Sequence, residues 1–94
     1  MKIHQKEVLA EVIAERDRQD RLWGIQDHKP GKWLAILGEE FGESCRAVLE
    51  MNPKYREELI QVAAVAIAAV ESFDRWIEQK KKEVLSNESD KQKL

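Results

Sequence analysis

Apolar residues recur at helical spacing along most of this 94-residue chain. From Lys2 to about Leu22 they return every three or four positions between charged residues, which predicts a first amphipathic helix. Its apolar positions are Ile3, Val8, Leu9, Val12 and Ile13. A charged run, 15–21, closes this helix. Such a run is usually a solvated face with ion pairs four residues apart, so we expect most of its side chains to face water.

A loop is expected between the first helix and the second. Gly24 suits the end of a helix, and Pro30-Gly31 suits a turn. The loop region carries an aromatic, an amide and an imidazole side chain close together, at Trp23, Gln26 and His28. Most helix connections are short and polar, so these side chains suggest that the loop is more than a linker. Trp23 could equally cap the core.

A second helix is predicted from about Lys32 to Glu50, and a third from near Pro53 to about Leu85. The inward stripe of the second helix is Leu34, Leu37, Phe41, Ser44 and Val48, flanked by Trp33 and Cys45. Asn52 suits the N-cap of the third helix and Pro53 its first position. The short connection therefore predicts an antiparallel pair of helices.

The middle of the third helix, 62–70, is apolar on all sides. Such a segment needs cover on more than one face, which three short helices cannot easily provide. We therefore expect an all-α antiparallel bundle of three main helices, completed by a second copy of the chain as a homodimer or homotetramer. The expected domain is 1–85, followed by a polar, disordered tail over 86–94.

Composition and charge exclude several classes of protein. Sixteen basic residues against eighteen acidic ones give a formal charge of −2, and the basic residues do not interleave with aromatics on one face, so no nucleic acid polymer is an expected partner. The apolar run over 62–70 is too short to span a membrane. The single cysteine excludes an internal disulfide. With no secretory signal evident, the cytoplasm is the expected compartment.

Acidic residues gather on the second and third predicted helices. Glu40 and Glu43 lie one turn apart on the shoulder of the apolar stripe, whereas Glu39 points further toward solvent. Glu58 shares its direction with the apolar residues of the third helix. A carboxylate aimed into a core costs several kcal/mol if it stays ionised and unpaired. Glu58 therefore needs a proton, a cationic side chain or a metal ion.

Two neighbours on the third helix offer different ways to satisfy Glu58. Gln61, one turn on, has a carbonyl oxygen on the same side, while Lys54, one turn back, has an ammonium group. Two such i,i+3 pairs on antiparallel helices would bring three carboxylates and one amide together, an all-oxygen site that suits Mg²⁺ or Mn²⁺ better than zinc. The alternative is a surface acidic pair together with a Glu58 that Lys54 neutralises.

Three stretches of the chain resemble the MazG-like branch of the all-α nucleoside triphosphate pyrophosphohydrolases. They are WGIQDH at 23–28, WLAILGEEFGE at 33–43 and EELIQVAA at 57–64, and the similarity spans roughly residues 12 to 75. That family carries EExxE on one helix and ExxD on the next, and both motifs bind Mg²⁺. The first motif is complete here as Glu39, Glu40 and Glu43. In the second motif Glu58 matches, but Gln61 stands at the position of the aspartate.

The resemblance implies that Glu40, Glu43, Glu58 and Gln61 hold Mg²⁺, with Mn²⁺ as a substitute. The ions would bridge the phosphates of a nucleoside triphosphate, and hydrolysis would release a nucleoside monophosphate and pyrophosphate. Glu39 and Glu43 are the candidate catalytic residues, Glu39 as an outer ligand or as a group that positions the attacking water.

Candidate substrate-binding residues follow from the same resemblance. Trp23 and Trp33 would stack on the base, Gln26 and His28 would hydrogen-bond to it, and Lys54 would contact phosphate. The neutral Gln61 should weaken the metal site. A noncatalytic helical module that binds nucleotide or a partner protein therefore stays open as an alternative, as does a purely structural helical oligomer.

Overall fold

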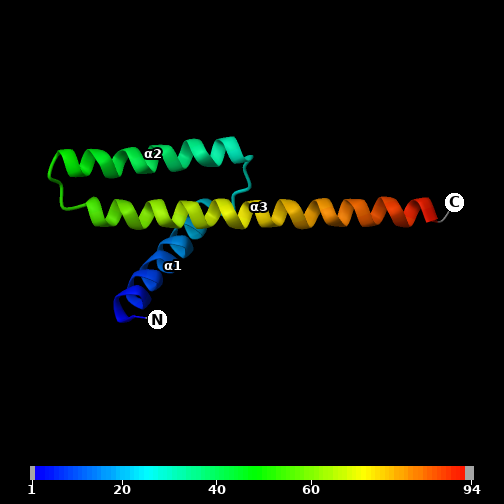
Figure 1. Ribbon diagram of the computed structural model, residues 1–94, viewed down its shortest axis with the longest axis horizontal. Coiled ribbons are helices and arrows are strands. Elements are labelled where there is room, and N and C mark those ends of the chain that lie inside the picture. The colour runs from blue at the N-terminus through cyan, green and yellow to red at the C-terminus, as the bar shows by residue number, and fades with distance from the viewer. Residues whose placement is uncertain (1, 93–94) are drawn as a thin grey trace.

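The computed structural model describes residues 2–92 as three helices. They are α1 (Ile3–Trp23), α2 (Pro30–Leu49) and α3 (Tyr55–Gln92), shown in Figure 1. The described residues contain no strand, which confirms the all-α prediction. Within that range no helix is long and apolar enough to cross a membrane.

The helix ends follow the local chemistry of the chain. Gly24 adopts a positive φ of 72°, and its N–H donates to the carbonyl of Asp20 over 2.9 Å, so α1 stops where the glycine predicted. α2 begins at Pro30 rather than at Lys32, because a proline fits the first position of a helix, where the N–H it lacks has no intrahelical partner. In the turn before α3, the side chain of Asn52 accepts the Lys54 N–H over 3.0 Å.

The longest helix, α3, extends beyond the end that the sequence predicted. Its backbone is helical from Tyr55 to Gln92, whereas a stop was expected near Leu85. The expected tail, 86–94, is therefore continuous with α3 as far as Gln92, and residues 93 and 94 lie outside the described part. The molecule measures 67 × 30 × 23 Å, and α3 spans its long axis (Figure 1).

The other two helices pack on α3 from different flanks. α2 lies antiparallel beside α3, as the short turn predicted, and α1 crosses α3 obliquely (Figure 1). Over residues 2–92, the backbones of α1 and α2 approach α3 and not each other. The core between α2 and α3 is small: it consists of Trp33, Val65 and Ala68, with Ile36, Leu37 and Ala69 packed against it.

Charged side chains, more than apolar ones, hold α1 on α3. α1 buries only Val12 and Gln19. Arg16 donates from Nε to Oε1 of Glu71 on α3 over 3.0 Å and also pairs with Asp20 on its own helix. The Arg16 and Glu15 side chains are each only 12% exposed, so the expectation that this charged run faces water was wrong for these residues. The run meets α3, whose Glu71 supplies the opposite charge.

Candidate metal centre

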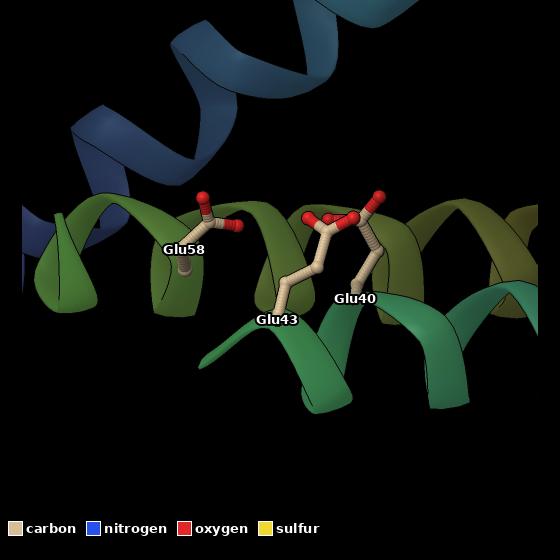
Figure 2. A group of neighbouring side chains, drawn as sticks. All are labelled: Glu40, Glu43 and Glu58. Atoms are coloured by element: carbon tan, nitrogen blue, oxygen red, sulfur yellow. The ribbon is translucent and has the colours of Figure 1, made fainter. Parts of the chain in front are cut away.

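Three carboxylates from two helices converge near the α2–α3 turn. Glu40 and Glu43 come from α2 and Glu58 from the first turn of α3 (Figure 2). One oxygen of each carboxylate lies within 4.8 Å of the corresponding oxygens of the other two. The i,i+3 spacing puts the first two on one side of α2, and the antiparallel neighbour brings the third opposite them.

Two of these carboxylates have buried oxygens without a partner. Oε2 of Glu40 and Oε2 of Glu58 are inaccessible to solvent, and neither has a hydrogen-bond partner among the described residues. Buried polar atoms in folded proteins are nearly always paired, and each exception calls for an explanation such as a bound ion. A positively charged group would satisfy these two oxygens, and the residues that the structure describes do not supply one.

The site is electrostatically unfavourable for ionised carboxylates. Burial raises the pKa of Glu40, and the negative charges of Glu43 and Glu58 raise it further. Burial also raises the pKa of Glu58, and the negative charge of Glu43 raises it further. A divalent cation would reverse both effects, because it favours the charged form of every carboxylate around it.

Lys54 does not compensate for this repulsion. Its charge lowers the pKa of Glu58, but it is the weakest of the influences on that group, and the net direction is upward. Within the part of the chain that the structure describes, Lys54 and Glu58 form no ion pair. The sequence-based alternative in which Lys54 alone neutralises Glu58 is therefore not supported by the geometry.

The residues fit a hard divalent cation. Three carboxylates provide oxygen ligands only, from two helices held side by side, and no histidine or cysteine belongs to the cluster. Mg²⁺ is commonly bound through one or two carboxylates together with water and substrate phosphates, and Mn²⁺ accepts similar ligands. Glu40, Glu43 and Glu58 are thus the residues that could hold such an ion.

Three other candidates for the metal and phosphate site, Glu39, Gln61 and Lys54, lie close to the cluster in sequence. Glu39 is exposed, and its charge contributes to raising the pKa of Glu40. Gln61 is half-buried one turn after Glu58. Lys54 is exposed in the turn before α3, and the N–H of Glu58 donates to its carbonyl over 2.9 Å.

The predicted base-binding residues lie further along the helix pair. Trp33 is buried in the core, and its ring packs against that of His28 with centroids 4.9 Å apart. Both rings line an open, largely apolar groove of about 840 Å³ between the start of α2 and the middle of α3. None of the three carboxylates lines this groove, and Trp33 precedes Glu40 by about 10 Å along α2.

Trp23 and Gln26 are not brought into the groove. Trp23 ends α1 and is exposed, and neither residue lines the groove. The carbonyl of Gln26 accepts a hydrogen bond from Arg75 over 3.4 Å, while Asp27 accepts one from Nε of Arg75 over 2.9 Å. Through these hydrogen bonds, Arg75 of α3 binds the loop that contains His28. Sequence reasoning did not identify this role.

Sequence reasoning also missed a fourth acidic residue, Glu15 on α1. Its charge contributes to raising the pKa of Glu40, so α1 brings it into the electrostatic neighbourhood of the carboxylate cluster. Glu15 is held by Arg18 at 2.8 Å and by Gln19 at 3.1 Å. The only sequence signal for it was the charged run itself, which gives no indication of what α1 faces.

Comparison of the chain with known proteins gave no relative. No protein-family model, no curated protein and no solved structure matches it. The function has to be argued from the carboxylate cluster and its surroundings.

Proposed function

We propose that this protein is a Mg²⁺-dependent nucleoside triphosphate pyrophosphohydrolase of the MazG-like all-α type, which converts a nucleoside triphosphate and water into a nucleoside monophosphate and pyrophosphate. The observation that carries the proposal is the convergence of Glu40, Glu43 and Glu58, of which Glu40 and Glu58 each have a buried oxygen with no hydrogen-bond partner among the described residues. A role in removing surplus or noncanonical nucleotides, a cytoplasmic location and a homodimeric or homotetrameric state belong to the same proposal.

Each candidate residue would have its own role in the proposed reaction. Glu40, Glu43 and Glu58 hold the metal from two helices. When bound, Mg²⁺ offsets the phosphate charge, polarises the α-phosphorus and lowers the pKa of a coordinated water. The exposed Glu39 would orient the attacking water, and the exposed Lys54, in the turn before α3, would contact a phosphate.

The groove beside the cluster supplies the proposed base site. His28 and Trp33 provide ring surfaces at its start, and its lining is largely apolar, as a stacked nucleobase requires. Trp33 is buried, so the half-exposed His28 ring is the more accessible of the two. Trp23 and Gln26 would contact the substrate only from outside this groove.

Direct assay of the product tests the proposal. Purified protein with Mg²⁺ or Mn²⁺ and a panel of ribo- and deoxyribonucleoside triphosphates should yield pyrophosphate, and Glu43→Gln should abolish it. Glu78→Gln, which changes an exposed acidic residue elsewhere on α3, serves as the matched control and should retain activity. No pyrophosphate from any nucleotide with either metal would refute the enzymatic proposal.

The second candidate is a noncatalytic module that binds nucleotide. It is favoured by one specific feature, the neutral Gln61 where the similar family has an aspartate. Calorimetric titration with Mg²⁺ and a nonhydrolysable nucleotide separates the two candidates when it is combined with the product assay. Binding without turnover supports the module, whereas binding with turnover supports the enzyme.

A further inference from the structure

The groove that contains the proposed base site is longer than a base. His28 and Trp33 line its start, and Trp33 belongs to the core cluster with Ala68 of α3. From there the groove continues along α3 to Phe73 and Trp76, about 7.5 and 12 Å beyond Ala68 at about 1.5 Å per residue. Its volume of about 840 Å³ lies within the roughly 300–1,000 Å³ of pockets that enclose whole drug-sized ligands. A single base beside Trp33 therefore leaves the remaining stretch unfilled.

This remaining stretch, which we call the far end, is lined by Val70, Phe73 and Trp76. Their side chains are apolar and exposed to 60%, 50% and 54%. Leu34 of α2, which the sequence assigned to the core, lines the same groove and is 67% exposed. A ligand that covers these side chains gains the free energy of removing apolar surface from water.

The walls of the far end are held in place by other side chains. Asp27 and Arg75 line the groove as well, but they pair with each other over 2.9 Å, so neither presents an uncompensated charge to an apolar ligand. The rings of Phe73 and Trp76 lie 5.9 Å apart, and Nζ of Lys80 lies 5.9 Å from the centroid of the Trp76 ring. These contacts orient the Trp76 ring although about half of it is exposed.

The carboxylate cluster determines which part of a nucleotide can reach the far end. Glu58 is in the first turn of α3, whereas Val70 and Trp76 lie about 18 and 27 Å further along that helix. A triphosphate held at the cluster directs its base toward Trp33, and the edge of the base opposite the glycosidic bond then points to the far end. Adenine and cytosine carry their exocyclic amines on that edge.

We infer that the groove selects nucleotides whose base carries a bulky apolar substituent on this outer edge, such as a benzyl group on the exocyclic amine, and that Val70, Phe73 and Trp76 bind the substituent. The inference rests on the proposed function and deepens it, because it names a substrate class for the same site. An unsubstituted base makes contacts only at the start of the groove. One methylene in an apolar pocket changes specificity about tenfold or more, so a benzyl group should contribute at least as much.

Calorimetric titration of the metal-free full chain with nucleosides tests the far end without requiring a metal or a reaction. Two matched pairs are compared: adenosine with adenosine benzylated on its exocyclic amine, and cytidine with cytidine benzylated on its exocyclic amine. In at least one pair the benzylated nucleoside should bind ten times more tightly or better. If the proposed enzyme is active, kcat/KM for the benzylated triphosphate of that pair should exceed that of the plain triphosphate by a similar factor.

Substitutions in the far end should remove this preference. Trp76→Ala and Phe73→Ala each take away an aromatic wall, so the ratio of the two dissociation constants should fall several-fold toward one. Trp76→Phe keeps an aromatic ring and should retain most of the preference. Leu85→Ala, which shortens another exposed apolar residue of α3 outside the groove, is the matched control and should leave the ratio unchanged. Far-UV circular dichroism establishes that each variant is still helical.

The outcomes separate this inference from the proposed function. Equal affinity for plain and benzylated nucleosides in both pairs overturns the inference, and so does a preference that survives in both Trp76→Ala and Phe73→Ala. Tighter binding of a benzylated nucleoside without pyrophosphate release from any triphosphate supports the far end as a ligand site and refutes the enzyme. Pyrophosphate release that is equally efficient with plain and benzylated triphosphates supports the enzyme and refutes the selection inferred here.

Discussion

Glu40 of α2 and Glu58 of α3 bring carboxylate oxygens within 4.8 Å of each other, and each retains a buried oxygen with no hydrogen-bond partner among the described residues. Two helices are thereby packed so that negative charges meet at their interface. A fold does not gain stability from such a contact, and the proposed metal site rests on this arrangement.

Neutralising one of these carboxylates should stabilise the metal-free protein. Glu58→Gln keeps the shape of the side chain but removes its repulsion with Glu43 and its unfavourable burial as a charge. We expect its melting temperature without metal to rise by a few degrees. The same variant should lose most of the stabilisation that Mg²⁺ gives the wild type, which is about 2.7 kcal/mol in the free energy of unfolding when the metal is at 100 times its Kd.

The control for this experiment is Glu78→Gln, which should leave both the metal-free melting temperature and its response to Mg²⁺ unchanged. A wild-type protein whose melting temperature does not respond to millimolar Mg²⁺ or Mn²⁺ would contradict the metal site. A lower melting temperature for metal-free Glu58→Gln would show that the carboxylate has a partner within the chain.

The response to Mg²⁺ should increase with pH. The pKa values of Glu40 and Glu58 are raised in the folded protein, so their contribution to stability is fully present below the unfolded pKa near 4.5 and is lost as pH rises through the folded values. Above them the carboxylates are ionised, repel each other and are ready to bind metal. The shift in melting temperature on adding Mg²⁺ should therefore be larger at pH 8 than at pH 5.

The shift in melting temperature on adding Mg²⁺ reports on Glu40 and Glu58, whereas the melting temperature alone also depends on the other acidic residues. Ion pairs lower the pKa values of Glu11, Glu15 and Asp27, so those residues make the fold less stable in acid. Their effect is present with and without Mg²⁺ and cancels in the difference. A metal shift that is equal at pH 5 and pH 8 would contradict a role for Glu40 and Glu58.

Periodicity predicted the number, type and order of the helices, because three-and-four spacing follows directly from helix geometry. The same geometry placed Glu40, Glu43 and Glu58 on facing sides of α2 and α3. It did not determine where α1 would pack, since a charged run such as 15–21 contains no information about the charge of its partner. It was right that Ser44 and Leu37 face the core, but Leu34, Phe41 and Val48, also assigned to the core face of α2, are exposed. A helix with two apolar stripes does not say which one meets α3.

The buried ion pair between Arg16 and Glu71 should contribute more to stability than the exposed pair between Arg56 and Glu11. Arg16 is largely buried between α1 and α3 and donates to Glu71 and Asp20, so Arg16→Met removes several charge-assisted hydrogen bonds. We expect a loss of about 1–3 kcal/mol in the free energy of unfolding by urea. Arg56→Gln, which removes the exposed pair with Glu11, should have little effect. If both variants lose the same free energy of unfolding, the burial of Arg16 contributes nothing to stability.

The last prediction concerns Gln61, which stands where the motif of the proposed family has an aspartate. Gln61 is half-buried one turn after Glu58, where an added carboxylate would lie beside three others. Without metal, Gln61→Asp should therefore lower the melting temperature, since it increases repulsion that is already unrelieved. With Mg²⁺ the extra charged ligand should raise metal affinity by about tenfold, measured by calorimetry. An increase in pyrophosphate release that parallels the gain in affinity would identify the wild type as an enzyme with a weakened site. Tighter metal binding without turnover would favour the noncatalytic module, and unchanged affinity would show that residue 61 does not reach the ion.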